Sequence, residues 1–197
     1  MAFSTSFKIY PVLDTKRLVL SEIDPSEAEA FHILQRSALE DPDGPPWEYG
    51  FETQSVENAR ASLGFCKKAW EKKTRLRFGV RLKSGSPSEG EPSVLIGCCE
   101  LFGIQNQYKA EVGYWLGAAH QRQGYMSEAL AAMVRHAFES MEMGRLYAQT
   151  SPRNDASLRM LRKVGFREEG VLRRSTLRGK EWDDSVLMAI LFTDSLR

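Results

Sequence analysis

The fold of this chain is decided around one stretch, Gln121-Arg122-Gln123-Gly124-Tyr125-Met126. A strand pattern over residues 109–117 precedes it, and a helix pattern begins near Met126. A helix N-terminus presents unpaired N–H groups and a positive dipole end, and glycine lets the main chain approach a ligand closely. The stretch therefore fits a phosphate-binding turn, and an ordinary strand-to-helix turn is the alternative that it leaves open. It lacks the lysine of a Walker loop and the three spaced glycines of a dinucleotide site.

The helix after this stretch carries an apolar stripe that marks its buried face. It is predicted to run from about Met126 to Met141. The pattern then predicts a strand over 145–151, a helix over 154–163 and two strands over about 166–177 and 181–192. The stripe comprises Met126, Leu130, Met133, Val134, Ala137 and Phe138.

Three strands lead up to the stretch, over residues 75–83, 93–103 and 109–117, and they predict an antiparallel meander. Before them we expect a strand over 15–23, a helix from Asp24-Pro25 to about Leu39, and a helix from Ser55 to about Lys73. This order predicts a central mixed, mostly antiparallel sheet with helices on both faces, in the α+β class. The length of 197 residues fits a single domain, residues 1–197, with its core over about 15–192.

The charge balance narrows the class of partners. The chain has 27 basic and 26 acidic residues and a net charge of +1, which argues against general binding of nucleic acid or of a membrane surface. The three cysteines and three histidines lack the spacing of a metal site. The N-terminus lacks the layout of a signal peptide, and no apolar run approaches membrane-spanning length. We therefore expect a cytoplasmic enzyme or binding protein without a metal.

The stretch around Gly124 resembles the acyl-CoA-binding motif of the GNAT superfamily of N-acetyltransferases, Gln/Arg-x-x-Gly-x-Gly/Ala. Gln121 and Gly124 match the motif, and Met126 departs from its small final residue. A bulky side chain at that position would crowd the phosphates of the ligand unless it turned into the apolar stripe of the helix.

The wider resemblance is to the ribosomal-protein alanine N-acetyltransferase (RimJ/RimL-like) branch, and it covers about residues 15–192. It implies a GNAT-like fold and an enzyme that transfers acetyl from acetyl-CoA, its co-substrate, to a primary amine. The branch favours a protein or peptide N-terminal amine. A small amine (a polyamine, an amino acid or an aminoglycoside) is the alternative within the class. A non-catalytic acyl-CoA-binding regulatory module is the alternative from another class, and a homodimer through the last strands stays open. The matching segments are residues 111–116, 127–130, 154–158, 161–166, 169–170 and 177–184.

The resemblance also implies where the cofactor lies. Strand 109–117 is expected to separate from its parallel neighbour at 145–151, so that the pantetheine arm pairs with the freed backbone. The side chains of Trp115 and Leu116 are expected to pack in the core. Asn154 suits an N-cap, and the resemblance adds a contact with the cofactor arm. The implied cofactor-binding residues are Trp115, Leu116, Gly117, Arg122, Gln123, Gly124, Tyr125, Met126, Ser127, Asn154 and Ser157.

Acetyl transfer to an amine needs a base for the amine proton, a hydrogen bond to the acetyl carbonyl and a proton for the leaving thiolate. Glu100 and Glu111 are the candidate bases, the N–H of Leu116 is the candidate donor, and Ser157 is the candidate acid. Glu100 interrupts an apolar run, where a carboxylate is costly unless it is paired or used, so a salt bridge is the alternative. An exposed position is the alternative for Glu111, and an ordinary first-turn serine is the alternative for Ser157.

Segment 40–50 is irregular, and the resemblance implies that it lies beside the acceptor, because in this fold the first helices and their connection line that cleft. Its aromatic side chains could pack on an acceptor and its carboxylates could attract a cation, and a solvated acidic loop is the alternative. The residues concerned are Asp41, Asp43, Trp47, Glu48 and Tyr49.

Overall fold

The computed structural model describes residues 10–39, 55–83, 93–105, 108–178 and 180–194. Four α-helices are found in these ranges: α1 (Ala28–Leu39), α2 (Val56–Glu71), α3 (Tyr125–Glu139) and α4 (Asp155–Val164). Three short 3-10 helices accompany them: η2 (Pro25–Glu27), η4 (Ala118–His120) and η5 (Phe192–Asp194). The described strands are β1 (Leu13–Asp14), β2 (Leu18–Ser21), β3 (Arg75–Leu82), β4 (Val94–Gln105), β5 (Lys109–Leu116), β6 (Arg145–Thr150), β7 (Arg167–Arg178) and β8 (Glu181–Leu191).

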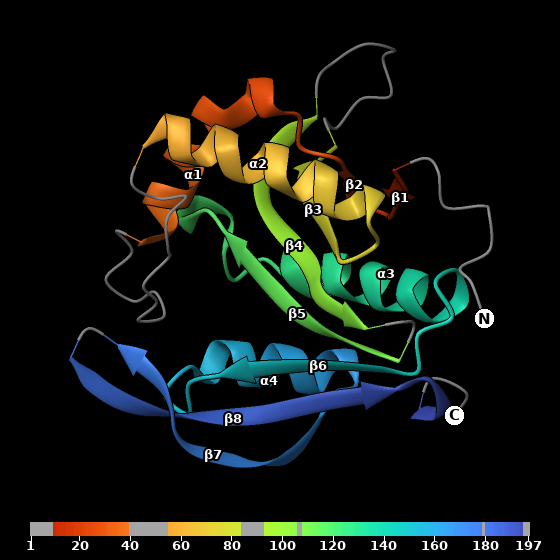
Figure 1. The fold of residues 1–197 in the computed structure, drawn as a ribbon, viewed down its shortest axis with the longest axis vertical. Coiled ribbons are helices and arrows are strands. Elements are labelled where there is room, and N and C mark those ends of the chain that lie inside the picture. Colours follow the sequence, from red (N-terminus) through yellow and green to blue (C-terminus); the bar gives the residue numbers. More distant parts are fainter. Residues whose placement is uncertain (1–9, 40–54, 84–92, 106–107, 179, 195–197) are drawn as a thin grey trace.

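The described strands form one sheet in the order β1-β2-β3-β4-β5-β6-β8-β7 (Figure 1). All neighbours are antiparallel except β5 and β6, which are parallel. The predicted α+β class, the mostly antiparallel sheet and the β3-β4-β5 meander are confirmed. None of the helices in the described ranges is long and apolar enough to cross a membrane.

One predicted strand is shorter in the structure. Of the strand expected over residues 15–23 the structure has β2, and β1 precedes it across a turn. Between them the N–H of Thr15 donates to the carbonyl of Leu18 at 3.0 Å, and the N–H of Leu18 donates to the hydroxyl of Thr15 at 3.0 Å. A threonine side chain that bonds to nearby backbone in this way competes with strand pairing and makes a turn.

The two faces of the sheet carry separate cores. On one face α1 and α2 cover a cluster that includes Phe31, Leu63 and Trp115. On the other face α3 and α4 cover a larger cluster, and the predicted apolar stripe of α3 is buried in it. In the view of Figure 1, α1 and α2 lie in front of the sheet and α3 and α4 behind it. Cys98 belongs to the first cluster and Cys99 to the second, as expected for consecutive residues of a strand.

Candidate active site

Strands β5 and β6 are paired over only part of their length and then separate. Their parallel pairing covers three residue pairs and ends at Glu111↔Tyr147. Beyond that pair, β5 continues to Leu116 and β6 to Thr150, and Figure 1 shows the two strands diverging toward their carboxyl ends. The expected separation is therefore confirmed. A gap of this kind leaves backbone groups without a neighbouring strand, so an extended ligand can pair with them.

The backbone of β5 directs polar groups into this gap. The N–H of Gly117 donates to the carbonyl of Ile96 in β4 at 3.0 Å, so its N–H points toward β4. Successive N–H groups of a strand point to opposite sides, and the N–H groups of Leu116 and Tyr114 therefore point toward the gap. The amide of Gln121 donates to the carbonyl of Leu116 at 3.1 Å. The Leu116 N–H thus has the orientation expected of a donor to the substrate carbonyl.

The loop after β5 contains left-handed residues of the kind that anion nests use. Arg122 has a φ of 60° and Gly124 a φ of 77°, so two residues of this short loop adopt the left-handed conformation. Left-handed residues that alternate with right-handed ones turn consecutive N–H groups toward one point. The N-terminus of α3 follows at once and adds its own unpaired N–H groups and dipole. The loop is therefore suited to bind a diphosphate.

Replacing Gly124 by alanine is expected to lower the free energy of unfolding by about 1 kcal/mol, because a side chain strains a left-handed residue. Steric overlap is not the cause, since the nearest atom to a Cβ at this position is Nη2 of Arg17 at 3.6 Å. Gly64 in α2 is the matched control, because a Cβ there meets nothing within 4 Å. Gly64→Ala is expected to raise the same free energy by about 0.5–1 kcal/mol, and urea unfolding of both variants measures the two signs. Equal effects would contradict the role given to the φ of Gly124.

Ser157 lies at the start of α4, on the face of the sheet that α3 and α4 cover. Its N–H donates to Oδ1 of Asn154 at 3.0 Å, which confirms Asn154 as an N-cap. Its hydroxyl lies 2.6 Å from the hydroxyl of Tyr114 in β5. Ser157 is buried, and burial raises the pKa of Tyr114 while the bond to Ser157 opposes that rise. A proton can therefore pass between the hydroxyl of Ser157 in α4 and that of Tyr114 in β5.

Glu100 forms the salt bridge that the sequence left open as its alternative. Its Oε2 lies 2.8 Å from Nε of Arg77 and 3.2 Å from Nε of Arg75, both on the neighbouring strand β3. The Arg77 side chain is only 4% exposed and that of Glu100 is 13% exposed. Two guanidinium groups therefore contact this carboxylate, and these ion pairs account for its position in an apolar run.

Glu111 has a different environment, at the last residue pair before β5 and β6 separate. It is half-buried and hydrogen-bonded to the side chain of Tyr147. Burial raises its pKa above the ordinary value for glutamate, and the bond from Tyr147 offsets only part of that rise. A carboxylate whose pKa is shifted toward neutrality is better suited to general-base catalysis.

The candidate acid and the candidate base lie on opposite faces of β5. Tyr114, which holds Ser157, packs against the core under α3 and α4, whereas Trp115 lies in the core under α1 and α2. Side chains alternate along a strand, so Glu111 shares its face with Trp115. A ligand in the gap between β5 and β6 would have Ser157 on one side and Glu111 on the other.

The remaining predicted residues fall into two groups. The side chains of Trp115, Leu116 and Met126 are buried in the two cores, as expected for the first two, and Met126 joins the stripe of α3 instead of blocking the loop. Loop residues Arg122, Gln123 and Gly124 are exposed, while Tyr125 and Ser127 are half-buried. Residues 40–50, with Asp41, Asp43, Trp47, Glu48 and Tyr49, lie outside the described residues.

Three residues beside the site were missed by sequence reasoning. Tyr114 bonds to Ser157, Tyr147 bonds to Glu111, and Arg17 contacts the loop through the carbonyl of Gln123. Each contact joins segments at least 30 residues apart, so no local sequence pattern predicts it. The one available signal was the alternation of β5, which sets Tyr114 opposite in direction to Trp115.

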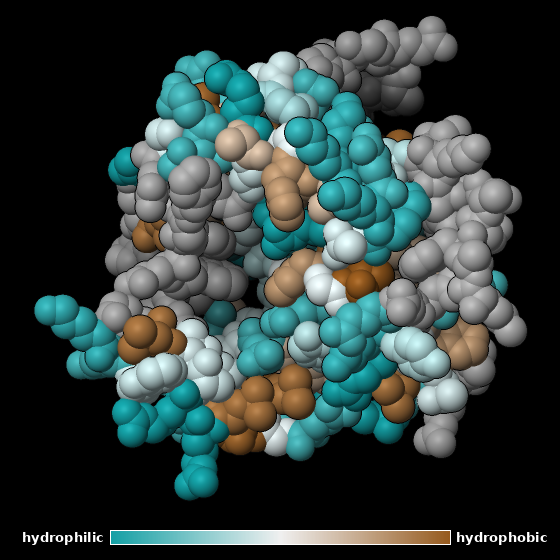
Figure 2. Space-filling model, in the orientation of Figure 1, coloured by the Kyte–Doolittle hydropathy of each residue, from teal (hydrophilic) through white to brown (hydrophobic). Residues whose placement is uncertain are grey.

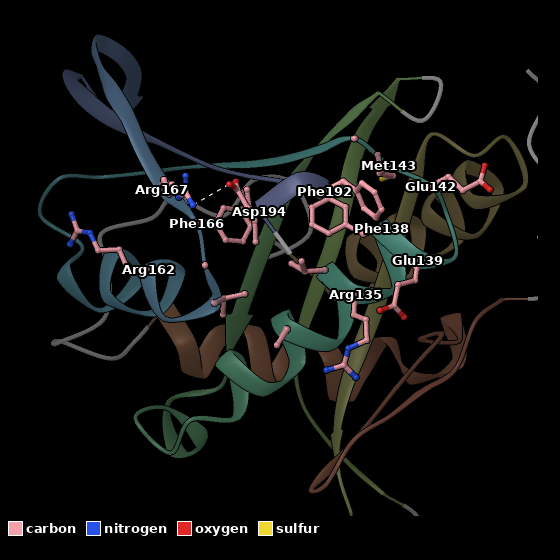
Figure 3. Close-up of a pocket in the computed structure, with 16 residues that line it drawn as sticks. Arg135, Phe138, Glu139, Glu142, Met143, Arg162, Phe166, Arg167, Phe192 and Asp194 are labelled. Atoms are coloured by element: carbon pink, nitrogen blue, oxygen red, sulfur yellow. Dashed lines mark ion pairs between the residues drawn. The ribbon is translucent and has the colours of Figure 1, made fainter. Parts of the chain in front are cut away.

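A cavity of about 1130 Å³ lies elsewhere, at the C-terminal ends of α3 and α4 (Figure 3). The candidate site lies at the N-terminal ends of the same two helices. The charged side chains that line the cavity include Arg135, Arg162 and Arg167 together with Glu139, Glu142 and Asp194. Because their charges balance, this cavity offers no net attraction to a diphosphate, and we assign it no part in the reaction.

Comparisons with known proteins agree on one kind of domain. Residues 17–167 match the family described as acetyltransferase (GNAT) domain. An uncharacterized N-acetyltransferase of Bacillus subtilis (strain 168), YoaA, is 30% identical over 168 residues, which cover 84% of this chain and 88% of that protein. The ribosomal-protein-serine acetyltransferase of Escherichia coli (strain K12) is 36% identical over 80 residues, which cover 41% of this chain and 45% of that protein.

A solved structure shows the same fold. RimL, a ribosomal L7/L12 alpha-N-protein acetyltransferase crystallised with coenzyme A, superposes with a TM-score of 0.80 at 19% identity. The superposition covers 92% of this chain and 98% of that one. At this level of identity the likeness concerns the fold alone.

Proposed function

This chain belongs to the GNAT family of acetyltransferases and is an acetyl-CoA-dependent N-acetyltransferase, and we propose that its acceptor is the N-terminal amine of a protein or peptide. The site that we propose for the reaction is the gap between β5 and β6, with Ser157 and Glu111 on its two sides. Acetyl-CoA supplies an activated acetyl group as a thioester. The roles of the residues around the gap follow from where their polar atoms point.

The cofactor is held chiefly by backbone. The N–H groups of Leu116 and Tyr114 face the gap and can pair with the amide groups of a pantetheine arm, which continues along Trp115–Gly117. Residues 122–127, the nest and the first turn of α3, can receive the diphosphate. Asn154 is the N-cap of α4, beside the same gap, and its side-chain amide can contact the cofactor arm.

In the reaction we assign Glu111 as the base that accepts a proton from the amine. The amine nitrogen then forms a bond to the thioester carbon, and the N–H of Leu116 stabilises the negative charge on the carbonyl oxygen. When the carbon–sulfur bond breaks, Ser157 donates its proton to the thiolate. Tyr114 can return a proton to Ser157 through their 2.6 Å contact. One proton leaves the amine and one reaches the sulfur, so the amide and free CoA balance. Glu111 then releases its proton to solvent and Tyr114 regains one from solvent, which restores the site.

In the part of the chain that the structure describes, the face of the sheet that carries Glu111 is only partly covered by helices, which supports a large acceptor. In the described part of the chain α1 packs on β4 and β5 and α2 on β3, and Figure 1 shows no helix in front of β6–β8. Gln149 on that face is exposed, and Tyr147 and Leu187 are half-buried. Among the described residues no helix covers the sheet at β6–β8 next to Glu111, and a surface of this kind accommodates a polypeptide end better than a closed pocket would. Relatives named as ribosomal-protein acetyltransferases favour the same class of acceptor.

We also propose that the reaction takes place in the cytoplasm, because its reducing conditions suit a chain with three buried cysteines, Cys66, Cys98 and Cys99.

The acceptor is tested with a panel under saturating acetyl-CoA. We expect release of free thiol with peptides that carry a free N-terminus, and none with the same peptides blocked at that position. Mass spectrometry should place the acetyl group on the α-amine. Turnover with spermidine, free amino acids or aminoglycosides but not with peptides would replace the proposal by the small-amine alternative. Binding of acetyl-CoA without turnover of any acceptor would point to a non-catalytic acyl-CoA-binding module.

A further inference from the structure

Arg17, at the turn that leads into β2, reaches the loop that precedes α3. Its backbone N–H donates to Oε1 of Glu128 at 2.8 Å, and its Nε donates to Oε2 of the same carboxylate at 2.7 Å. Its Nη1 donates to the carbonyl of Gln123 at 3.0 Å. Its guanidinium also lies 4.5 Å from the centre of the Tyr125 ring. One side chain from the first strands of the sheet therefore contacts the loop and the first turn of α3 together.

The contact of Arg17 with Glu128 matters for the binding of an anion at the N-terminus of α3. Glu128 is the acidic residue in the first turn of α3, where a carboxylate suits the dipole of the helix but opposes the binding of an anion. Burial alone would raise its pKa, yet the hydrogen bonds from Thr15 and Arg17 outweigh burial and lower that pKa. The carboxylate therefore stays ionised, and both of its oxygens are covered by donors from residues 15–17.

Three backbone carbonyl groups around the loop also accept hydrogen bonds from side chains. The side chain of Gln121 donates to the carbonyl of Leu116, that of Gln123 donates to the carbonyl of Ala119, and Arg17 donates to the carbonyl of Gln123. Carbonyl oxygens that faced the nest would repel phosphate oxygens. Three side-chain donors prevent this, and only one of them, Arg17, comes from outside the motif.

We propose that Arg17 is a positioning residue of the diphosphate site, a role that rests on the proposed binding of the CoA diphosphate at this loop. It neutralises Glu128 and holds the carbonyl of Gln123 away from the nest, so that the N–H groups of the loop and of α3 face the ligand. Its Nη2 lies 3.6 Å from the Cβ position of Gly124, which puts a positive charge at the edge of the nest.

The test compares the affinity of the full-length protein for CoA and for pantetheine, which lacks the diphosphate, by calorimetric titration and by competition. Arg17→Ala is expected to weaken CoA binding about tenfold and to leave pantetheine binding unchanged, as loss of a charge at a helix N-terminus would. Arg17→Lys keeps the charge without the fork of donors and should fall between the two. Adding Glu128→Gln to Arg17→Ala should recover much of the lost affinity, which a merely structural role would not allow.

Lys83→Ala is the matched control. Lys83 is also a cation beside the turn at Thr15, since it lies 2.9 Å from Asp14 and donates to the carbonyl of Thr15, but its recorded partners do not include the loop. Its removal should leave CoA affinity within about twofold. An Arg17→Ala protein that binds CoA like the wild type, or that loses CoA and pantetheine equally, would overturn the role of Arg17 alone. A wild type that binds no CoA would overturn the diphosphate site as well.

Discussion

Replacing Glu111 by glutamine is expected to lower kcat about 100- to 10,000-fold, the range that a general base contributes. Glutamine keeps the shape of the side chain and can still accept the hydrogen bond from Tyr147, but it cannot take a proton. The change therefore removes the proton acceptor and little else. Steady-state kinetics with a peptide acceptor measure the effect, and the KM for acetyl-CoA should change little because the cofactor is held elsewhere.

The pH profile gives the same substitution a second readout. The wild-type kcat/KM should fall as pH drops through the raised pKa of Glu111, because the protonated carboxyl is no longer a base. The glutamine variant should lack this limb and keep only the limb that belongs to the amine itself. A profile with the same limbs in both proteins would mean that another group takes the proton.

The contribution of Glu111 to the free energy of unfolding depends on pH in the direction opposite to kcat/KM. The folded-state pKa of Glu111 is raised, so the protonated carboxyl is the form that folding favours. Its contribution to the free energy of unfolding is present below the unfolded-state pKa of about 4.3 and is lost as pH rises through the folded-state pKa. Glutamine stays neutral at every pH. The stability of Glu111→Gln relative to the wild type should therefore increase from pH 4 to pH 7, as urea unfolding can show.

The variant Glu100→Gln tests whether Glu100 or Glu111 is the base. Breaking the ion pairs of Glu100 with Arg75 and Arg77 is expected to lower the free energy of unfolding by about 3–5 kcal/mol, because the Arg77 guanidinium stays buried without that carboxylate. The kcat of the folded fraction should fall far less than in Glu111→Gln. The reverse order of the two effects on kcat would make Glu100 the base.

Much of the fold could be predicted because its signals are local. The apolar stripe of α3 and the Asn154 cap of α4 depend on residues within a turn or two of each other, and both are confirmed. The turn at Thr15 was missed because it depends on a hydrogen bond between the Thr15 side chain and the backbone of Leu18, which competes with a plausible strand pattern. Resemblance supplied the separation of β5 and β6, for which periodicity has no signal.

The candidate site was harder to predict because its contacts depend on register and topology. A carboxylate in an apolar run shows that Glu100 must be paired or used, but its arginine partners follow from the pairing of β3 with β4. The contact between Tyr114 and Ser157 requires that α4 return beside β5 after a parallel crossover. The same holds for Arg17, which meets Glu128 across more than half of the chain.

Replacing Ser157 by alanine is expected to lower kcat about 100-fold, near the lower end of the range for a general acid. A thiol leaves as a thiolate more readily than an alkoxide does, since the pKa of a thiol is about 8.5, so the missing proton costs less than it would for an oxygen leaving group. The N-cap bond should survive, because Asn154 accepts from the backbone N–H of residue 157. The measurement is kcat at saturating acetyl-CoA and peptide.

The Tyr114 hydroxyl offers a way to distinguish loss of catalysis from loss of stability in Ser157→Ala. Ser157→Ala removes the hydroxyl that contacts the half-buried Tyr114, which should lower the free energy of unfolding by about 1 kcal/mol. Adding Tyr114→Phe removes both hydroxyls and keeps the ring in the core, so the double variant should regain most of that stability without regaining activity. Recovery of kcat in the double variant would show that the loss came from the unpaired hydroxyl. In that case Ser157 would not be the donor to the thiolate.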